Sequence, residues 1–425
     1  MNVWLFVFII LLLAFLGAPL FTIIAAIGLY AFTSADISTS ALIIDLYKIA
    51  DTPTLIAVPL FTFAGYLLAE SKSPKRLVDL AQALFGWMPA GLAIVALFTC
   101  AVFTAFTGAS GVTIVALGGL LYPILLKERY PEQFSLGLIT ASGSIGLLFP
   151  PSLPIILYGF VAKVSIDQLF VAGLIPGILL IAVLSVYSLR VSTKAHVPKT
   201  PFSWSNVRMA VKAAAWEIPL PFVVIGGIYG GAFTATEAAA ITAFYALVVE
   251  VFIYKDLHLV RDIPRVMKRS MVLVGAILMI LGSALGLMNY LIDEQVPQQL
   301  FEIVQAHVSS KVMFLLILNA FLLVMGMMME IFSAIVTVPL ILPIAQKFNI
   351  DPVHLGIIFL TNLEIGYMMP PMGLNLFLSS LRFEKSIFHL SRAVIGFIFL
   401  ELIALFIITY VPDLSLWLVR VLGTQ

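Results

Sequence analysis

Long apolar runs separated by short charged segments set the pattern of this chain. A helix that crosses the hydrocarbon core of a bilayer needs about 20 mostly apolar residues. Runs near this length recur from one end of the sequence to the other, and charged residues stand between most of them. The pattern predicts membrane helices over residues 3–30, 54–69, 88–107, 112–126, 134–163, 169–190, 217–232, 236–254, 270–291, 311–328, 331–346, 354–380 and 393–412.

Composition supports a membrane protein and excludes other classes. The 425 residues are 62% hydrophobic and 11% charged, too few polar side chains to cover a water-soluble globule of this size. A net charge of +1 gives no electrostatic surface for nucleic acid. The single cysteine, Cys100, excludes internal disulfides and thiolate metal clusters. The five histidines are scattered, and no phosphate-binding glycine motif occurs, so we expect no organic cofactor.

The distribution of basic residues predicts the topology. Most of the 23 Lys and Arg residues fall in one set of loops, which the positive-inside rule makes cytoplasmic. The run 3–30 is too long for a cleaved signal and is interpreted as a retained span. The N-terminus is then cytoplasmic and the C-terminus periplasmic. The pairs 88–107 with 112–126 and 311–328 with 331–346 each return to their starting side, as two full spans or as a re-entrant hairpin.

A weak internal repeat appears when the sequence is shifted by 220 residues. Pro150-Pro151 then meets Pro370-Pro371, and Gly146 meets Gly366. The charge argument gives the two copies opposite orientations. Inverted repeats with interrupted helices are typical of secondary transporters, whose site lies between the repeats near the bilayer midplane.

Two interruptions in the first copy are candidates for the site. Residues 106–111 place two glycines and two hydroxyls inside an apolar stretch, and residues 141–152 place a Gly/Ser run before Pro150-Pro151. Broken backbone survives in hydrocarbon only where protein or a wet cavity satisfies it. Carbonyls freed at the second break suit Na⁺, and the following helix N-terminus near Ser152 suits an anion. A surface turn and a kinked packing helix remain as alternatives.

The second copy has matching interruptions at residues 326–333 and 362–375. Glu330 and Glu364 stand in apolar runs, where an acidic group costs at least about 2.5–3.5 kcal/mol. Each is interpreted either as a cation-binding or helix-pinning carboxylate, or as a protonated or interfacial one. No basic residue falls at the middle of a predicted span. An anionic solute would then be bound by helix N-termini, cations, hydroxyls and amides, and the candidates are Thr107, Ser110, Ser152, Ser333, Asn362 and Asn375.

At these motifs the chain resembles the large membrane subunit of tripartite ATP-independent periplasmic (TRAP) transporters. Residues 143–152, 370–377 and 53–65 carry the resemblance. It implies an all-α polytopic fold with two re-entrant hairpins, two broken helices and an elevator mechanism in the bacterial inner membrane. It also implies Na⁺ symport of a small organic acid of the sialic acid or C4-dicarboxylate type. The implied partners are a small four-helix membrane subunit, expected as a separate chain, and a periplasmic substrate-binding protein.

The resemblance also implies two Na⁺ sites, one in each half. The family often has Asp where this chain has Glu330, and Thr where it has Met369, so a hydroxyl ligand is missing from the second site. The residues carried over to the first site are Thr107, Gly108, Ser110, Gly143, Ser144, Leu147 and Pro150, and those carried over to the second are Gly326, Glu330, Asn362, Gly366, Met369 and Met372.

The expected domain division follows the repeats. Residues 1–87 and 164–310 form scaffold helices, 88–163 and 311–380 form the two halves of a transport domain, and 381–425 form a C-terminal scaffold helix. A stand-alone cation-coupled dicarboxylate carrier of related fold is the alternative function. An intramembrane enzyme is disfavoured because Ser110 has no His or Lys at membrane depth to act as its base. A channel is disfavoured because no selectivity ring is visible, and we expect no enzymatic activity.

Overall fold

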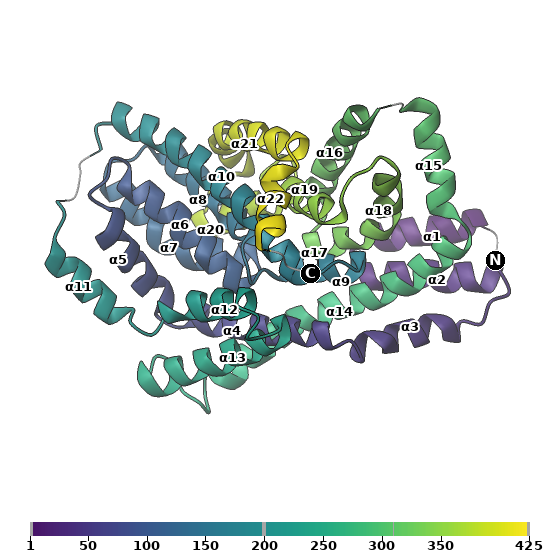
Figure 1. The fold of residues 1–425 in the computed structure, drawn as a ribbon, viewed down its shortest axis with the longest axis horizontal. Helices are drawn as coiled ribbons and strands as arrows, with labels where there is room; N and C mark the ends of the chain where they lie inside the picture. The colour runs from purple at the N-terminus through teal and green to yellow at the C-terminus, as the bar shows by residue number, and fades with distance from the viewer. Residues whose placement is uncertain (1–2, 198–200, 309, 423–425) are drawn as a thin grey trace.

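The computed structural model describes residues 3–197, 201–308 and 310–422, without the side chains of residues 41, 45 and 50. Every regular element in this described part is helical, as the apolar runs predict (Figure 1). Seven single helices are long and apolar enough to cross a membrane, and one sharply bent pair can form an eighth span. The predicted all-α, multi-pass fold is therefore confirmed.

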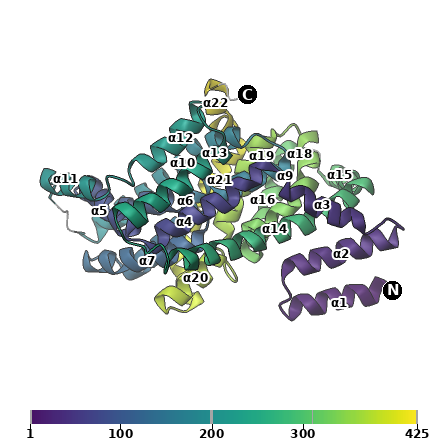
Figure 2. The same cartoon turned by 90° about the horizontal axis from the view of Figure 1, so that it is seen from below.

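The first apolar run differs from the prediction. Instead of one span over residues 3–30, the chain forms α1 (Val3–Phe15) and α2 (Leu20–Ser34). Gly17 at φ +80° and Pro19 before α2 end the first helix and start the second. The two helices fold back on each other, with the rings of Phe6 and Tyr30 stacked at 4.0 Å (Figure 2). The prediction of a single span was wrong because hydropathy does not register a left-handed glycine turn.

One group of helices packs around the long α14. Helix α14 contacts α2, α3 and α4, and α4 also packs against α13. Figures 1 and 2 both show α3 and α14 extending side by side toward the N-terminal helices. The bounds of these elements are α3 Ser40–Ala50, a 3₁₀ turn η1 Pro53–Ile56, α4 Ala57–Glu70, α13 Ala235–Val248 with a π-helical end η3 Val249–Ile253, and α14 Ile263–Asp293.

Two helical hairpins occupy the predicted positions. The first consists of α6 (Gly91–Thr107) and α7 (Ser110–Lys127), joined by two residues. The second begins with α16 (Lys311–Met328) and turns at Met329 and Glu330. Its returning arm is interrupted, with α17 at Ile331–Ala334, a 3₁₀ turn η4 at Ile335–Thr337 and α18 at Val338–Lys347.

Two helices break where the sequence has its paired prolines. The first is α8 (Glu132–Ile145), which passes through a 3₁₀ turn η2 (Gly146–Leu148) into α9 (Leu153–Ala162), with a bend of 44°. The second is α19 (Pro352–Gly366), followed by α20 (Leu374–Phe383). Both breaks match the sequence prediction, because proline removes a backbone donor and cannot continue a helix.

Two long helices pack against the broken ones. Helix α10 (Ile166–Lys194) contacts α6, α9 and α19, and α21 (Ile387–Tyr410) contacts α8, α10, α19 and α20. The C-terminal α22 (Asp413–Leu422) lies on α10 and α19. The hairpins, the broken helices and these two long helices therefore share one core.

Shorter helices connect this core to the helices around α14. Helix α5 (Ser73–Phe85) leads into the first hairpin, and α15 (Val296–His307) leads into the second. Helix α11 (Trp204–Ala213) packs on α5, and α12 (Pro219–Tyr229) packs on α13.

A buried ion cluster fixes the start of α5. The Arg76 guanidinium contacts Glu217, Glu250 at 3.0 Å and Asp256 at 2.5 Å. Burial alone would lower the pKa of Arg76, but hydrogen bonds to Asp256 and Glu217 raise it. Burial would raise the pKa of Asp256, and the bonds from Arg76 and from the N–H of Lys72 lower it. Because removing one partner from a buried ion cluster leaves an uncompensated charge, this contact holds α5 firmly at its first turn.

Candidate functional site

A cavity of about 620 Å³ lies where both hairpin turns meet α4 and α14. The first turn contributes residues 108–112, and the second contributes residues 330–332. Leu147 and Tyr367 reach it from the two broken helices. Tyr66, Glu70 and Arg269 form the opposite wall. Segments more than 200 residues apart in the sequence therefore share one hollow.

The first hairpin turn presents a buried hydroxyl to this cavity. Gly108 ends α6 at φ +65°, and a Cβ atom there would strike the side chain of Leu153 in α9. Only glycine fits both the left-handed backbone and the close packing. Ser110 then starts α7 with 3% of its surface exposed, and its Oγ has no hydrogen-bond partner among the described residues. This hydroxyl is available to a ligand.

The second hairpin turn is tied to the second break. The Tyr367 hydroxyl accepts a hydrogen bond from the N–H of Ile331 at 2.5 Å, and Tyr367 is 2% exposed. Glu330 is the N-cap residue of α17, and it lines the main cavity. Glu330 also lines a neighbouring hollow of about 450 Å³ with Gly326 and Met372. A carboxylate therefore stands at the turn itself.

The two breaks lie against each other. The Asn375 amide of α20 donates to the carbonyl of Thr140 at 3.1 Å and to the hydroxyl of Ser144 at 3.2 Å. The 3₁₀ turn Gly146–Leu148 packs on α19. The helix that follows the second break therefore contacts the end of α8, and the turn at the first break contacts α19.

Each break also packs tightly on its own hairpin through a glycine. A Cβ on Gly366 would lie 2.7 Å from backbone atoms of Gly326, and one on Gly146 would strike the backbone of Ala101. In the first half, the Thr104 hydroxyl bonds the carbonyl of Gly143 at 2.9 Å. Broken helix and hairpin arm therefore touch backbone to backbone in both halves.

The buried oxygen atoms near the turns and breaks suit a hard cation. Ser110 Oγ, Ser152 Oγ, Asn362 Oδ1 and Asn375 Oδ1 have no hydrogen-bond partner among the described residues. Within that part of the chain no group of three His, Cys, Asp or Glu side chains is arranged so that it could hold a metal ion. Na⁺ is a hard cation that favours oxygen ligands, and broken transporter helices supply carbonyls for it. These oxygen atoms are therefore of the kind that Na⁺ prefers as ligands.

The structure separates the predicted solute residues into two groups. Ser110 lines the main cavity, and Thr107 precedes its turn. Ser152, Asn362 and Asn375 are fully buried, and Ser333 is 8% exposed. These last four are not among the residues that line the main cavity. The Asn362 amide instead donates to Asn319 Oδ1 at 2.8 Å, which ties α19 to the hairpin arm α16.

The predicted Na⁺ residues also lie at different depths. In the first set Gly108, Ser110 and Leu147 line the main cavity, whereas Thr107, Gly143, Ser144 and Pro150 are buried. In the second set Gly326, Asn362 and Gly366 are buried, Met369 is half-buried, and Glu330 and Met372 are exposed. Whether these residues bind Na⁺ stays a prediction.

The wall formed by α4 and α14 was missed by the sequence argument. Arg269 lies in the first turns of α14, directly before the apolar run 270–291, and is one of the basic residues that the positive-inside rule places in cytoplasmic loops. Its Nη1 contacts Oε1 of Glu70, the last residue of α4. A signal was present, because an arginine that directly abuts an apolar run can lay its stem along the helix while its guanidinium stays in a wet cavity.

The two acidic residues singled out in the second half have different surroundings. Glu330 lines the cavity, whereas Glu364 is fully buried in α19. Both carboxyl oxygens of Glu364 lack a hydrogen-bond partner among the described residues, as do those of Glu401 in α21. Glu364 is therefore not part of the cavity wall.

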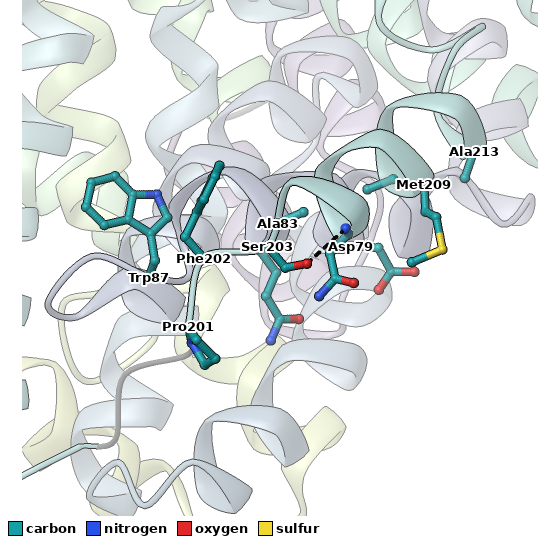
Figure 3. A pocket seen from close by; sticks show the side chains of 11 residues that line it. Asp79, Ala83, Trp87, Pro201, Phe202, Ser203, Met209 and Ala213 are labelled. Atoms are coloured by element: carbon teal, nitrogen blue, oxygen red, sulfur yellow. Dashed lines mark hydrogen bonds between the residues drawn. The ribbon is translucent and has the colours of Figure 1, made fainter.

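A separate pocket of about 360 Å³ lies between α5 and α11 (Figure 3). Figure 3 shows Trp87 and Phe202 on one side and Asp79 with Met209 on the other. None of the predicted site residues is among the residues that line it. The cavity between the hairpin turns is the better candidate site.

Hairpin turns and interrupted helices around one cavity are the architecture of a secondary transporter. The profile of the family described as tripartite ATP-independent periplasmic transporter, DctM component, matches residues 4–414. The chain belongs to this family, as the sequence resemblance implied.

Individual relatives agree with this assignment. The chain is 36% identical over 389 residues to the C4-dicarboxylate TRAP transporter large permease protein DctM of Pseudomonas aeruginosa, covering 91% of each chain. It is also 36% identical to the isethionate TRAP transporter permease protein DctMQ of Oleidesulfovibrio alaskensis, covering 86% of this chain and 58% of that protein. The crystal structure of the Alcanivorax borkumensis YdaH transporter shares its fold, with a TM-score of 0.59, 14% identity, and coverage of 88% and 87%. The protein is therefore a multi-pass large permease of the TRAP type.

Proposed function

We propose that this chain carries a small organic anion across the bacterial inner membrane, driven by a Na⁺ gradient and supplied by a periplasmic binding protein. The observation that carries the proposal is the cavity between the two hairpin turns. Unpartnered oxygens of Ser110 and of two asparagines lie in the surrounding turns and breaks. A small solute and a hard cation can therefore be held by neighbouring parts of one unit.

Electrostatics favours coupling to a cation. Two carboxylates, Glu70 and Glu330, line the cavity, and Arg269 is the one basic side chain among its described lining residues. An anion that enters this hollow meets excess negative charge unless a cation accompanies it. Na⁺ bound at the nearby breaks lowers that repulsion, so solute and ion bind more strongly together than either does alone.

The packing supports a two-body elevator movement. The hairpins and broken helices form one unit, and α2, α3, α4, α13 and α14 form the other. The cavity lies between the two, where sliding would carry it across the membrane. The contacts of α21 with α8, α10 and α19 favour placing this helix in the moving unit, rather than in the scaffold as the sequence-based division has it.

The proposal includes an orientation and two partners. We place the basic loops and the N-terminus in the cytoplasm and the C-terminus in the periplasm, following the positive-inside rule. The family name describes a three-part system. The partners proposed here are a separate four-helix membrane subunit and a secreted binding protein.

Reconstitution tests this function. The large and small subunits are placed in proteoliposomes with the binding protein outside. Uptake of succinate, isethionate and sialic acid is measured under an inward Na⁺ gradient and again with K⁺ in place of Na⁺. We expect uptake of at least one solute that needs both Na⁺ and the binding protein. Uptake without the binding protein would support a stand-alone carrier, and uptake independent of Na⁺ would contradict the coupling.

Ser144→Ala tests the first ion site. The Ser144 hydroxyl accepts from Asn375 and sits in the fully buried first break. If it also binds Na⁺, the half-saturating Na⁺ concentration rises about three- to tenfold, as expected for one lost oxygen ligand of about 1 kcal/mol. Expression should stay normal. An unchanged Na⁺ dependence of uptake would remove Ser144 from the site.

A further inference from the structure

An ion pair lies on the cavity wall opposite the hairpin turns. Arg269 Nη1 contacts Glu70 Oε1, and both residues line the cavity. The Arg269 side chain is 57% exposed, and that of Glu70 is 27% exposed. Because the pair is accessible, it is held only weakly and can exchange partners.

The Arg269 guanidinium has capacity for a second partner. Among the described residues its hydrogen bond uses one nitrogen, Nη1, and goes to one carboxylate. A guanidinium carries five N–H donors in a planar fork that matches a carboxylate or a sulfonate. Such paired charged hydrogen bonds are stronger than neutral ones. The remaining donors are therefore suited to an oxyanion in the cavity.

We propose that Arg269 recognises the carboxylate or sulfonate group of the transported solute, and that Glu70 competes with the solute for Arg269. This inference rests on the proposed transport of an organic anion. In the empty cavity Glu70 neutralises Arg269. A solute anion displaces Glu70 from part of the guanidinium, and Glu70 recovers Arg269 when the solute leaves. The α4–α14 wall thereby selects for negative charge while it keeps binding weak enough for release.

Charged thiol reagents test this electrostatic role without knowledge of the solute. Ala109→Cys places a thiol at the first hairpin turn, on the cavity surface. Cys100, the only native cysteine, is 1% exposed, so the unmodified chain supplies the background rate. The large and small subunits are prepared in inside-out membrane vesicles. Reaction rates are measured with an anionic reagent, 2-sulfonatoethyl methanethiosulfonate, and with a cationic one, 2-(trimethylammonium)ethyl methanethiosulfonate.

Opposite shifts are expected for the two partners. Arg269→Gln should lower the anionic-to-cationic rate ratio about three- to tenfold, because two carboxylates then dominate the cavity. Glu70→Gln should raise the ratio. Arg269→Lys should keep the ratio close to that of the parent, because the positive charge stays. Lys268→Gln is the matched control, since Lys268 is exposed on the same helix turn but does not line the cavity. The ratio for Lys268→Gln should stay within about twofold of the parent, because salt screens an exposed charge beyond a Debye length of about 10 Å.

Several outcomes would overturn the inference. One is an equal change in Arg269→Gln and Lys268→Gln, and another is a shift in the same direction for Arg269→Gln and Glu70→Gln. Val115→Cys, a second position on the cavity wall, repeats the test if Ala109→Cys is not assembled. The assay uses neither Na⁺ nor binding protein, so its result is independent of the uptake experiment.

Discussion

The break between α8 and α9 is enclosed by protein, whereas the break between α19 and α20 opens to the surface. Pro150, Pro151 and Ser152 are all buried. At the corresponding place in the second half, Pro370 and Pro371 are exposed, and Met372 is 68% exposed. The hairpins also differ, in the continuity of their returning arms. The first returns in one continuous helix, and the second returns through the 3₁₀ turn Ile335–Thr337.

This difference indicates different tasks for two segments of similar sequence. Broken backbone in a membrane must be satisfied by protein, water or ions. The first break meets this need with neighbouring helices and polar contacts, so it forms a fixed support. The second break lies beside the 450 Å³ hollow at Glu330, where water and ions can reach it. The second half is therefore the more adjustable of the two.

Bulky substitutions at the two packing glycines should show the contrast most strongly. Gly146→Leu and Gly366→Leu both force a side chain against backbone, which overpacks the core by about 1–3 kcal/mol or more. We expect Gly146→Leu to reduce the amount of folded protein more than Gly366→Leu does, because the break that follows Gly366 is open to the surface. Gly366→Leu should fold but lose uptake. Expression, thermal stability and Na⁺-driven uptake are measured together.

Gly275→Leu is the control for this pair, since nothing lies within 4 Å of a Cβ at that position of α14. Equal folding loss in the two test variants would refute the idea that only the first break is a fixed support.

The bond between the breaks should matter next. Asn375→Ala removes the amide that donates hydrogen bonds to the Thr140 carbonyl and to the Ser144 hydroxyl. A loss of about 1–3 kcal/mol of stability is expected, because two buried hydrogen bonds are lost together. Thermal unfolding in detergent measures this, and uptake should fall in parallel. Full stability of Asn375→Ala would mean that the two breaks are not held together by this contact.

Met369→Thr probes the missing hydroxyl of the second ion site. Met369 is half-buried directly before Pro370, so a hydroxyl there can point to the open side of the break. One added oxygen ligand of about 1 kcal/mol should lower the half-saturating Na⁺ concentration about fivefold. Uptake as a function of Na⁺ concentration gives the answer. An unchanged value would place the second ion elsewhere.

The smallest effect is expected at Ser152. Its hydroxyl is fully buried without a described partner, and it does not line the main cavity. If no ion or solute contacts it, Ser152→Ala removes an unsatisfied polar group and should raise stability slightly, by about 1 kcal/mol. The half-saturating solute concentration should not change. A loss of solute affinity would restore Ser152 to the list of binding residues.

Several elements could be predicted because their causes are local. Paired prolines end a helix wherever they stand, so both breaks were predicted at Pro150-Pro151 and Pro370-Pro371. The turn at Gly108 followed from glycines in an apolar stretch. The fold of the first run into α1 and α2 was missed, because its cause is the left-handed conformation of one residue, Gly17.

The sequence by itself determined the membrane class, the interrupted helices and the family, since hydrophobic length and proline chemistry act within a few residues. Tertiary structure alone decided which interruption is enclosed, which predicted polar groups reach the cavity, and that Arg269 of α14 meets Glu70 of α4 across from the hairpin turns. These outcomes depend on contacts between segments about 200 residues apart in the sequence. Hydropathy and spacing describe only neighbours in the chain, so they carry no information about which wall closes a cavity.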